Sequence, residues 1–219
     1  MKPPVDGLEV AASAVPLTVA AVRAAFTPAV APAGPSAPVA ADVVAAAVLL
    51  TLVPVDERGD NSPAGVVLIR RAAHLRQNPG EIGFPGGRIE SGEQPLAAAL
   101  REAEEEVALS RGDIDVLGRL SPLTRTRSAD LIMPFVAASN GRLELEANPD
   151  EVEAILLVPL AELLAPGCYW QERWDADDSP AQTMHFFDLG EDLIWGATSK
   201  MLYALFLRLL RGRDTSPVL

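Results

Sequence analysis

The stretch GGRIESGEQPLAAALREAEEEVAL, residues Gly86–Leu109, decides the fold of this 219-residue chain. Its glycine turn leads into a predicted helix, Pro95–Val107. On that helix Glu102, Glu105 and Glu106 occupy positions i, i+3 and i+4, so the three carboxylates project from one side. Because like charges at this spacing repel, the cluster predicts a neutralising partner. A hard divalent cation with oxygen ligands and substrate phosphates fits best.

The spacing within this stretch is specific. Gly87 is followed after five residues by Glu93, and seven further residues lead to the run Arg101–Leu109. This pattern resembles the Nudix box, Gly-x5-Glu-x7-Arg-Glu-U-x-Glu-Glu-x-Gly-U, where U is aliphatic. Ala108 stands where the family usually has glycine, and we expect the helix to continue through it or to end without a left-handed residue. The alternative interpretation of the glutamates is an exposed acidic helix face.

The net charge and the amino-acid composition argue against several classes of function. The formal net charge of −12 argues against a nucleic-acid-binding surface, and it means that any phosphate site needs local basic residues. A single cysteine, Cys168, excludes an internal disulfide framework and a cysteine-rich metal site. The sequence has no apolar run long enough for a membrane span and no clean signal segment, so we expect a cytoplasmic protein.

The chain suits one domain. We expect that domain over residues 42–212, with an N-terminal tail over 1–41 and a C-terminal tail over 213–219. Within the first tail, Pro16–Phe26 predicts a short helix, and the Ala- and Pro-rich residues 27–41 predict an extended linker. The favoured interpretation is a tail without function. The alternative is a helix that packs on the domain or on a dimer partner.

Hydrophobic patterning predicts a mixed set of elements. The box helix could begin near Gly92, with Ser91 as its cap. Two further helices are expected over Leu160–Leu164 and Thr198–Arg211, and the antiparallel pair Tyr169–Trp174 and Thr183–Leu189 is expected near the end of the chain. The remaining predicted strands are Val43–Val55, Val66–Arg70, Ile114–Leu120, Leu131–Ala137, Leu143–Glu146 and Glu153–Val158. The fold class is α/β, a Nudix-type α/β/α sandwich with a mixed β-sheet.

A second stretch resembles one particular branch of this family. LIRRAAHLRQNPGEIGFPGG, residues 68–87, resembles the signature upstream of the box in coenzyme A pyrophosphatases, where it is regarded as a coenzyme A recognition element. Ile69 replaces a threonine that is usual there. Three further stretches resemble the same branch, so the resemblance covers about residues 43–210; they are Leu120–Pro134, Asn148–Leu160 and Ile194–Thr198.

The resemblance implies hydrolysis of the diphosphate bond of coenzyme A or acyl-coenzyme A. The products would be 3′,5′-ADP and 4′-phosphopantetheine or its acyl form, and the cofactor Mg²⁺ or Mn²⁺. A second copy of the chain is one partner to consider. Other Nudix substrates, such as a dinucleotide or a nucleotide sugar, remain an alternative. A non-catalytic ligand-binding module is another, although the complete set of box residues argues against it.

The resemblance also assigns roles to individual residues. Glu105 and Glu106 are the expected metal ligands, with Glu102 as a third ligand or the base and the Gly87 carbonyl completing the site. Arg101, one turn before Glu105, is expected to hold a carboxylate in position. Two acidic residues outside the box are candidates for the general base, Glu151 and Glu153. The expected substrate-binding residues are Arg70, Arg71, Arg76, Gly80, Phe84, Gly86, Arg125 and Arg127.

A few other side chains invite a functional interpretation. His185 lies between apolar residues and is expected to be packed, and Cys168 to be buried and inert. The three tryptophans, Trp170, Trp174 and Trp195, are expected in the core or an interface rather than as stacking platforms for adenine, with the alternative that one of them serves as both.

Overall fold

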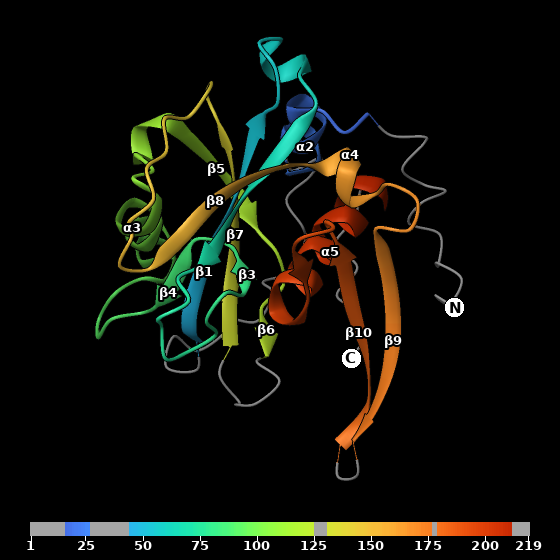
Figure 1. The fold of residues 1–219 in the computed structure, drawn as a ribbon. Helices are drawn as coiled ribbons and strands as arrows, with labels where there is room; N and C mark the ends of the chain where they lie inside the picture. The colour runs from blue at the N-terminus through green and yellow to red at the C-terminus, as the bar shows by residue number, and fades with distance from the viewer. Residues whose placement is uncertain (1–15, 27–43, 125–130, 177–178, 212–219) are drawn as a thin grey trace, which may run out of the picture.

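The computed structural model describes residues 16–26, 44–124, 131–176 and 179–211 (Figure 1). The central strand is β1 (Val44–Pro54), an apolar, alanine-rich run. It pairs in parallel with β7 (Leu131–Ser139) and antiparallel with β2 (Ala64–Arg71) and β4 (Gly86–Arg88). β8 (Val152–Pro159) pairs antiparallel with β2 at one edge of the sheet. The sheet is therefore mixed, as expected.

Three further strands complete this sheet, and only the longest of them, at Ile114–Arg119, was predicted from the sequence. They are β3 (Ile82–Gly83), β5 (Ile114–Arg119) and β6 (Leu123–Thr124), with strand order β3-β2-β1-β7-β5 along the main path. Two 3₁₀ turns, Gly59–Asn61 and Arg111–Asp113, lie in the loops.

Helices cover both faces of the sheet (Figure 1). α3 (Pro95–Val107) packs on one face, while α2 (Val19–Phe26) and α5 (Gly196–Arg211) pack on the other. Side chains of β1 alternate between the two layers, so Leu49 joins the α3 side and Leu50 the α5 side. This alternation of buried residues on both faces explains why the strand sequence is apolar throughout.

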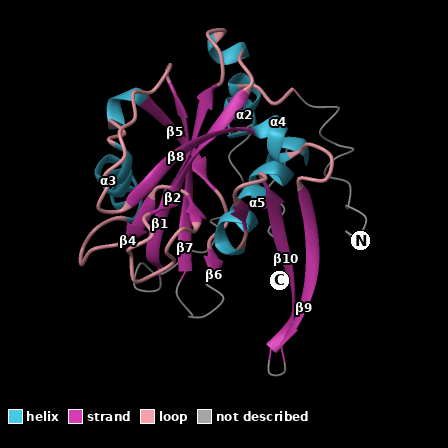
Figure 2. Ribbon diagram, viewed as in Figure 1, coloured by secondary structure: helices cyan, strands magenta, loops and turns pink. Residues whose placement is uncertain are grey.

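A second, smaller sheet follows in the chain. β9 (Tyr169–Ala176) and β10 (Ser179–Asp188) form the expected antiparallel hairpin, and β11 (Leu193–Ile194) pairs with β10. A four-residue helix, α4 (Leu160–Leu163), precedes this sheet. Figure 2 shows the hairpin beside α5 and extending beyond the end of the main sheet. No described helix is long and apolar enough to cross a membrane.

The predicted strand Leu143–Glu146 is wrong, because this segment is irregular. Its backbone serves the end of α3 instead. The N–H of Glu146 donates to the carbonyl of Val107 at 3.1 Å, and the N–H of Asn148 donates to the carbonyl of Glu106 at 2.9 Å. The last carbonyls of a helix have no hydrogen-bond donor within the helix. Here the returning chain donates N–H groups to two of these carbonyls.

The start of α3 also differs from expectation. The helix begins at Pro95, preceded by Gln94, and no side chain caps it. Gly92 has a φ of 80°, which is incompatible with a helix start there, so the expected Ser91 cap is wrong. Proline at the first helical position suits this start because its missing N–H would have no partner anyway.

Ala108 contradicts the expectation for the other end of α3. Its φ is 54° and its ψ 30°, so the helix ends on a left-handed residue. The N–H of Ala108 donates to the carbonyl of Glu104 at 3.0 Å, and the N–H of Leu109 donates to that of Ala103 at 3.2 Å. Leu109 is buried by this reversal. The hydrophobic contact and the terminal hydrogen bonds thus hold the alanine in a conformation that glycine adopts without strain.

Replacing Ala108 by glycine should therefore raise the free energy of unfolding by about 1 kcal/mol, because it removes the Cβ strain of a left-handed residue. Urea denaturation would measure the change. Ala97→Gly is the matched control. Ala97 is exposed inside the same helix, where glycine should lower stability by about 1 kcal/mol. Equal destabilisation by both substitutions would contradict the assigned conformation.

The described part of the expected N-terminal tail is a helix that packs on the domain. α2 is packed into the core: Val19, Val22 and Phe26 are buried there. Arg208 of α5 lies with its Cζ 4.2 Å from the centre of the Phe26 ring, and its Nε donates to the carbonyl of Ala25 at 3.2 Å. The helix was predicted, and its packing on the domain agrees with one form of the alternative interpretation of this segment.

Candidate metal centre and substrate cleft

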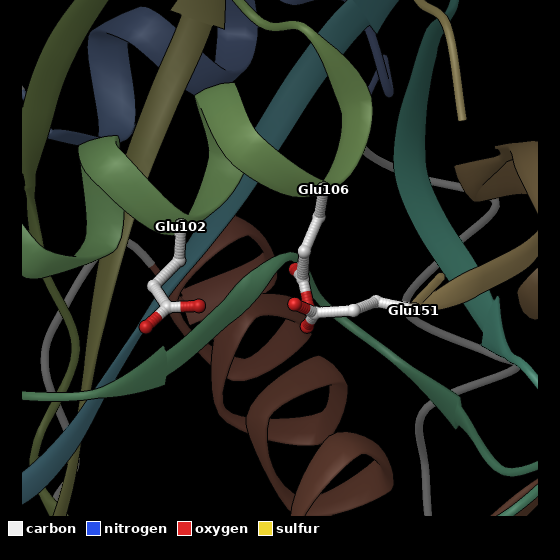
Figure 3. Close-up of side chains that lie close together, drawn as sticks. All are labelled: Glu102, Glu106 and Glu151. Atoms are coloured by element: carbon white, nitrogen blue, oxygen red, sulfur yellow. The ribbon is translucent and has the colours of Figure 1, made fainter. Parts of the chain in front are cut away.

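Three carboxylates converge at one place beside the main sheet (Figure 3). Glu102 and Glu106 come from the same side of α3, and Glu151 reaches toward them from the turn before β8. One oxygen from each lies within 4.8 Å of the others. The donor set contains only carboxylate oxygens, which are the ligands that a hard divalent cation prefers. These residues therefore fit Mg²⁺ or Mn²⁺.

Glu106 is the most buried of the three, at 1% exposed. Its Oε2 accepts a hydrogen bond from the Gly86 N–H at 2.8 Å, and its Oε1 lies 3.8 Å from Nη1 of Arg71. Burial raises the pKa of Glu106 to about 7; the neighbouring Glu102 and Glu151 add to the shift, while Gly86 and Arg71 oppose it. A buried carboxylate beside two others is costly when ionised, and a bound cation would remove that cost.

Glu102 lies directly against the glycine turn. A Cβ on Gly87 would overlap the Glu102 carboxylate, so only glycine lets this backbone and the carboxylate approach so closely. Burial also raises the pKa of Glu102, although Arg101 opposes the shift. The structure thus brings the expected Gly87 backbone next to an expected metal ligand.

Arg101 organises the acidic residues around it. Its Nε and Nη2 donate to the two oxygens of Glu93 at 3.0 and 3.1 Å, and its Nη1 donates to both Glu102 and Glu105 at 3.0 Å. Nη2 also donates to the Arg88 carbonyl at 3.1 Å. These hydrogen bonds raise the pKa of Arg101 and lower that of Glu93. A planar guanidinium can serve several acceptors at once and hold Glu102 in place.

Gly86 joins the turn to the sheet. It has a φ of 150°, and a Cβ there would collide with the Ala47 carbonyl and the Val48 Cα of β1. Glycine therefore allows β4 to pair closely with β1, at the register Val48↔Gly86. This pairing aims the Gly86 N–H at Glu106.

The carboxylates lie at one end of a cleft of about 810 Å³. The cleft is large enough for a ligand of drug size or more. Near the carboxylates it is lined by Arg71, Arg88 and the glycine turn, and elsewhere by α5 and the β9–β10 hairpin. The lining residues from those two elements and the turn between them are Trp174, Gln182, Met184, Trp195, Gly196, Ala197, Thr198 and Met201.

The structure brings some of the predicted residues to the cleft and leaves others away. Glu102, Glu106 and Glu151 line it, and so do four of the expected substrate-binding and metal-site residues, Arg71, Phe84, Gly86 and Gly87. Glu105 is exposed on α3 and is held by Arg101. It lies outside the cluster formed by Glu102, Glu106 and Glu151, which is called the carboxylate group below. Of the two base candidates, Glu151 is at the site, whereas Glu153 is exposed and pairs with Arg70.

Other predicted substrate-binding residues do not line the cleft. Arg70 donates from Nε and Nη2 to the two oxygens of Asp192 at 3.0 and 2.8 Å, which ties β2 to the loop before β11. Arg76 and Gly80 are exposed outside the lining residues. Arg125 and Arg127 lie outside the described part of the chain.

Sequence reasoning missed several lining residues. Arg88 follows the glycine turn but was not singled out, although a basic residue there would serve a phosphate. Trp174 and Trp195 are 48% and 40% exposed, so neither lies in the core, which was one of the two positions expected for them. Their surroundings depend on how the second sheet folds back toward the first, and no local pattern reveals that. By contrast, His185 and Cys168 are buried as expected.

Comparison with known proteins places this geometry in a family. The NUDIX domain model matches residues 46–178. The uncharacterized Nudix hydrolase NudL of Photorhabdus laumondii is 37% identical over 142 residues, or 64% of this chain and 74% of the relative. NudL of Salmonella paratyphi B is 34% identical over 147 residues, 66% and 75% of the two chains.

A solved structure agrees in fold. The MutT/nudix family protein from Enterococcus faecalis superposes with a TM-score of 0.51 at 18% identity, covering 77% of this chain and 62% of that one. The family match spans the sheet, the box helix and all three clustered carboxylates. The chain belongs to the Nudix hydrolase family.

Proposed function

We propose that this protein hydrolyses the diphosphate bond of coenzyme A or acyl-coenzyme A, giving 3′,5′-ADP and 4′-phosphopantetheine or its acyl form. One observation carries the proposal. The segment that resembles the coenzyme A signature forms a wall of the same cleft that holds the carboxylate group. Its lining members are Arg71, Gln77, Asn78, Glu81, Ile82, Gly83, Phe84, Gly86 and Gly87. The segment that resembles a recognition element and the proposed hydrolytic site thus share one cleft, which supports the proposal.

Glu102 and Glu106 would hold Mg²⁺ or Mn²⁺ in this protein, and Glu151, with an oxygen within 4.8 Å of theirs, would serve either as a third ligand or as the general base. When bound, the metal would polarise the phosphoryl oxygens and lower the pKa of the attacking water. Glu105 remains a proposed ligand, but its carboxylate is held by Arg101 at 3.0 Å, so its use as a ligand requires this ion pair to open.

The other residues of the site bind and position the substrate. Arg71 lines the cleft and has its Nη1 3.8 Å from Glu106, and a planar guanidinium in this position suits a phosphate. Of the two candidates for the general base, Glu151 is preferred because its carboxylate lies beside those of Glu102 and Glu106, whereas Glu153 pairs with Arg70; as the base it would act on the attacking water instead of ligating the metal. The Gly86 N–H and Arg101 keep Glu106 and Glu102 in place.

Product analysis after incubation with coenzyme A and Mg²⁺ or Mn²⁺ tests the proposal. A dinucleotide, a nucleotide sugar and ADP-ribose would be assayed side by side. We expect 3′,5′-ADP and 4′-phosphopantetheine from coenzyme A, at a higher kcat/KM than for the other compounds. Turnover of another compound with coenzyme A left intact would overturn the substrate. Binding without any turnover would favour a non-catalytic module.

The 3′-phosphate of coenzyme A should be read by a cleft arginine. Arg71 and Arg76 were the expected candidates, but Arg76 does not line the cleft and Arg71 is close to Glu106, whereas Arg88 lines the cleft and is exposed. Dephospho-coenzyme A should therefore be the poorer substrate, by about tenfold to a hundredfold in KM, the value of one charge-assisted contact.

Replacing Arg88 by methionine should narrow that gap and leave kcat unchanged, since the side chain is removed but its backbone carbonyl still accepts from Arg101. Arg111→Met is the matched control, because Arg111 is exposed in the loop before β5 and outside the cleft. Steady-state kinetics on both compounds would measure the gap. If the wild-type protein treats the two compounds alike, no arginine reads the third phosphate.

A further inference from the structure

The end of the cleft formed by the hairpin has aromatic walls. Trp174 of β9 lies opposite Gln182 of β10 in the hairpin register, and Met184 follows on the same strand. Trp195 contributes from the turn before α5. Both tryptophans are exposed and line the same cavity, so their aromatic surfaces are accessible to a ligand bound there.

The indole of Trp174 is held in a fixed orientation. Its Nε1–H donates to Oε2 of Glu172 at 2.9 Å, and its ring is tilted against Phe186 with centroids 6.1 Å apart. Trp170 donates to the other oxygen of Glu172 at 3.0 Å. These two hydrogen bonds, with that of Trp174 the larger cause, lower the pKa of Glu172, so its carboxylate stays ionised and keeps both indoles in place.

The polar group of Trp174 is therefore already used, and what remains for a ligand is the face of the indole. A rigid aromatic face loses little conformational entropy on binding and stacks with a planar ring. The side chain of Gln182, exposed across the hairpin from it, offers both hydrogen-bond donors and acceptors. A planar heterocycle with a polar edge can stack on the indole of Trp174 and hydrogen-bond to the side chain of Gln182 at the same time.

We propose that Trp174, with Gln182 and Trp195, forms the subsite for the adenine ring of a nucleotide substrate. The proposal rests on the proposed function only in that the substrate contains adenine and occupies the same cleft. The phosphates then lie toward Arg71, Arg88 and the carboxylate group, at the other end. The apolar pantetheine arm is the competing occupant of the aromatic end, and the experiment separates the two.

The test compares ligands with and without the base. Binding of AMP and of ribose 5-phosphate, each with Mg²⁺, would be measured by calorimetry for the wild-type protein and for Trp174→Leu. We expect the substitution to weaken AMP by about 5- to 100-fold, the usual contribution of one stacked base, and to leave ribose 5-phosphate unchanged. Trp174→Phe, which keeps an aromatic face, should restore most of the AMP affinity.

Trp170→Leu is the matched control. Trp170 lies two residues away on the same strand, donates to the same Glu172 and stacks on Phe186 at 5.1 Å, but it does not line the cleft. Its replacement should leave AMP affinity unchanged. If Trp170→Leu weakens AMP as much as Trp174→Leu does, the hairpin acts only as a scaffold and the proposal fails.

Two further outcomes separate this inference from the proposed function. If Trp174→Leu weakens 4′-phosphopantetheine and spares AMP, the arm occupies the aromatic end and the adenine subsite is refuted. If coenzyme A is not hydrolysed but Trp174→Leu still weakens AMP selectively, the adenine subsite stands and only the substrate assignment fails.

Discussion

Glu106→Gln should reduce kcat/KM about a thousandfold while the protein stays folded. The substitution removes an ionised ligand from the carboxylate group, and a bound metal contributes several kcal/mol to catalysis of this kind. The amide oxygen of glutamine can still accept the Gly86 N–H, which lies 2.8 Å from the present carboxylate. Steady-state kinetics at saturating Mg²⁺, with circular dichroism as the check on folding, would measure the effect.

The same substitution should change how stability depends on pH in the metal-free protein. Burial raises the pKa of Glu106 from 4.5 to about 7, so the folded state binds this proton more tightly than the unfolded state. The wild-type protein should therefore lose stability as the pH rises from 4.5 to 7, by roughly 3 kcal/mol if this group acted alone. Glutamine does not titrate, so the variant should lack this loss.

Glu104→Gln provides the control for both measurements. Glu104 is exposed on the same helix and outside the carboxylate group, so kinetics and pH dependence should remain those of the wild type. Near-normal turnover of Glu106→Gln at saturating metal would remove Glu106 from the proposed metal site. A variant that loses stability with rising pH as the wild type does would show that another group titrates.

Phe26→Ala should lower the free energy of unfolding by about 3–5 kcal/mol, although the residue lies outside the region matched by the family model. The Phe26 ring is 6% exposed, and Arg208 of α5 lies over it at 4.2 Å. Truncation removes a large apolar surface and leaves a cavity between α2 and α5. For a chain of this size the melting temperature should fall by about 6–20 °C, as measured by calorimetry.

Val55→Ala is the matched large-to-small control, because Val55 is half exposed at the end of β1 and its truncation should change stability by less than about 0.5 kcal/mol. Kinetic constants of both variants at a temperature well below melting should stay near the wild-type values. A fall in melting temperature of Phe26→Ala no larger than that of the control would show that α2 contributes little to the fold.

The sequence predicted the helices and strands whose formation depends mainly on residues close together in the chain. The bounds Pro95–Val107 follow from a proline that suits the first helical position and a stripe of alanine and leucine. The long apolar runs of β1 and β7 were equally clear as strands. Their parallel pairing was not predictable, because strand partners far apart in the sequence are chosen by the whole fold.

The differences arise where tertiary contacts override local signals. Ala108 is left-handed because Leu109 is buried and the chain must turn back over the helix end. Arg70 resembled a phosphate ligand, but Asp192 holds its guanidinium from 122 residues away in the sequence. Glu151 could be offered only as one of two candidates, because residues two apart in a regular strand point to the same side and the sequence does not separate them. In the structure Glu151 precedes β8 and joins Glu102 and Glu106, whereas Glu153 lies within β8 and pairs with Arg70.

The strand pairing of the two sheets is separate among the described residues: β11, β10 and β9 pair only with one another, while Glu102, Glu106 and Glu151 belong to the larger sheet, its helix and its turns. Changes in the hairpin therefore need not disturb the backbone that carries Glu102 and Glu106. In evolution, such an arrangement lets one hydrolytic core acquire new ligands by altering a peripheral hairpin. For a protein engineer, the hairpin is accordingly the segment to diversify when a different substrate is wanted.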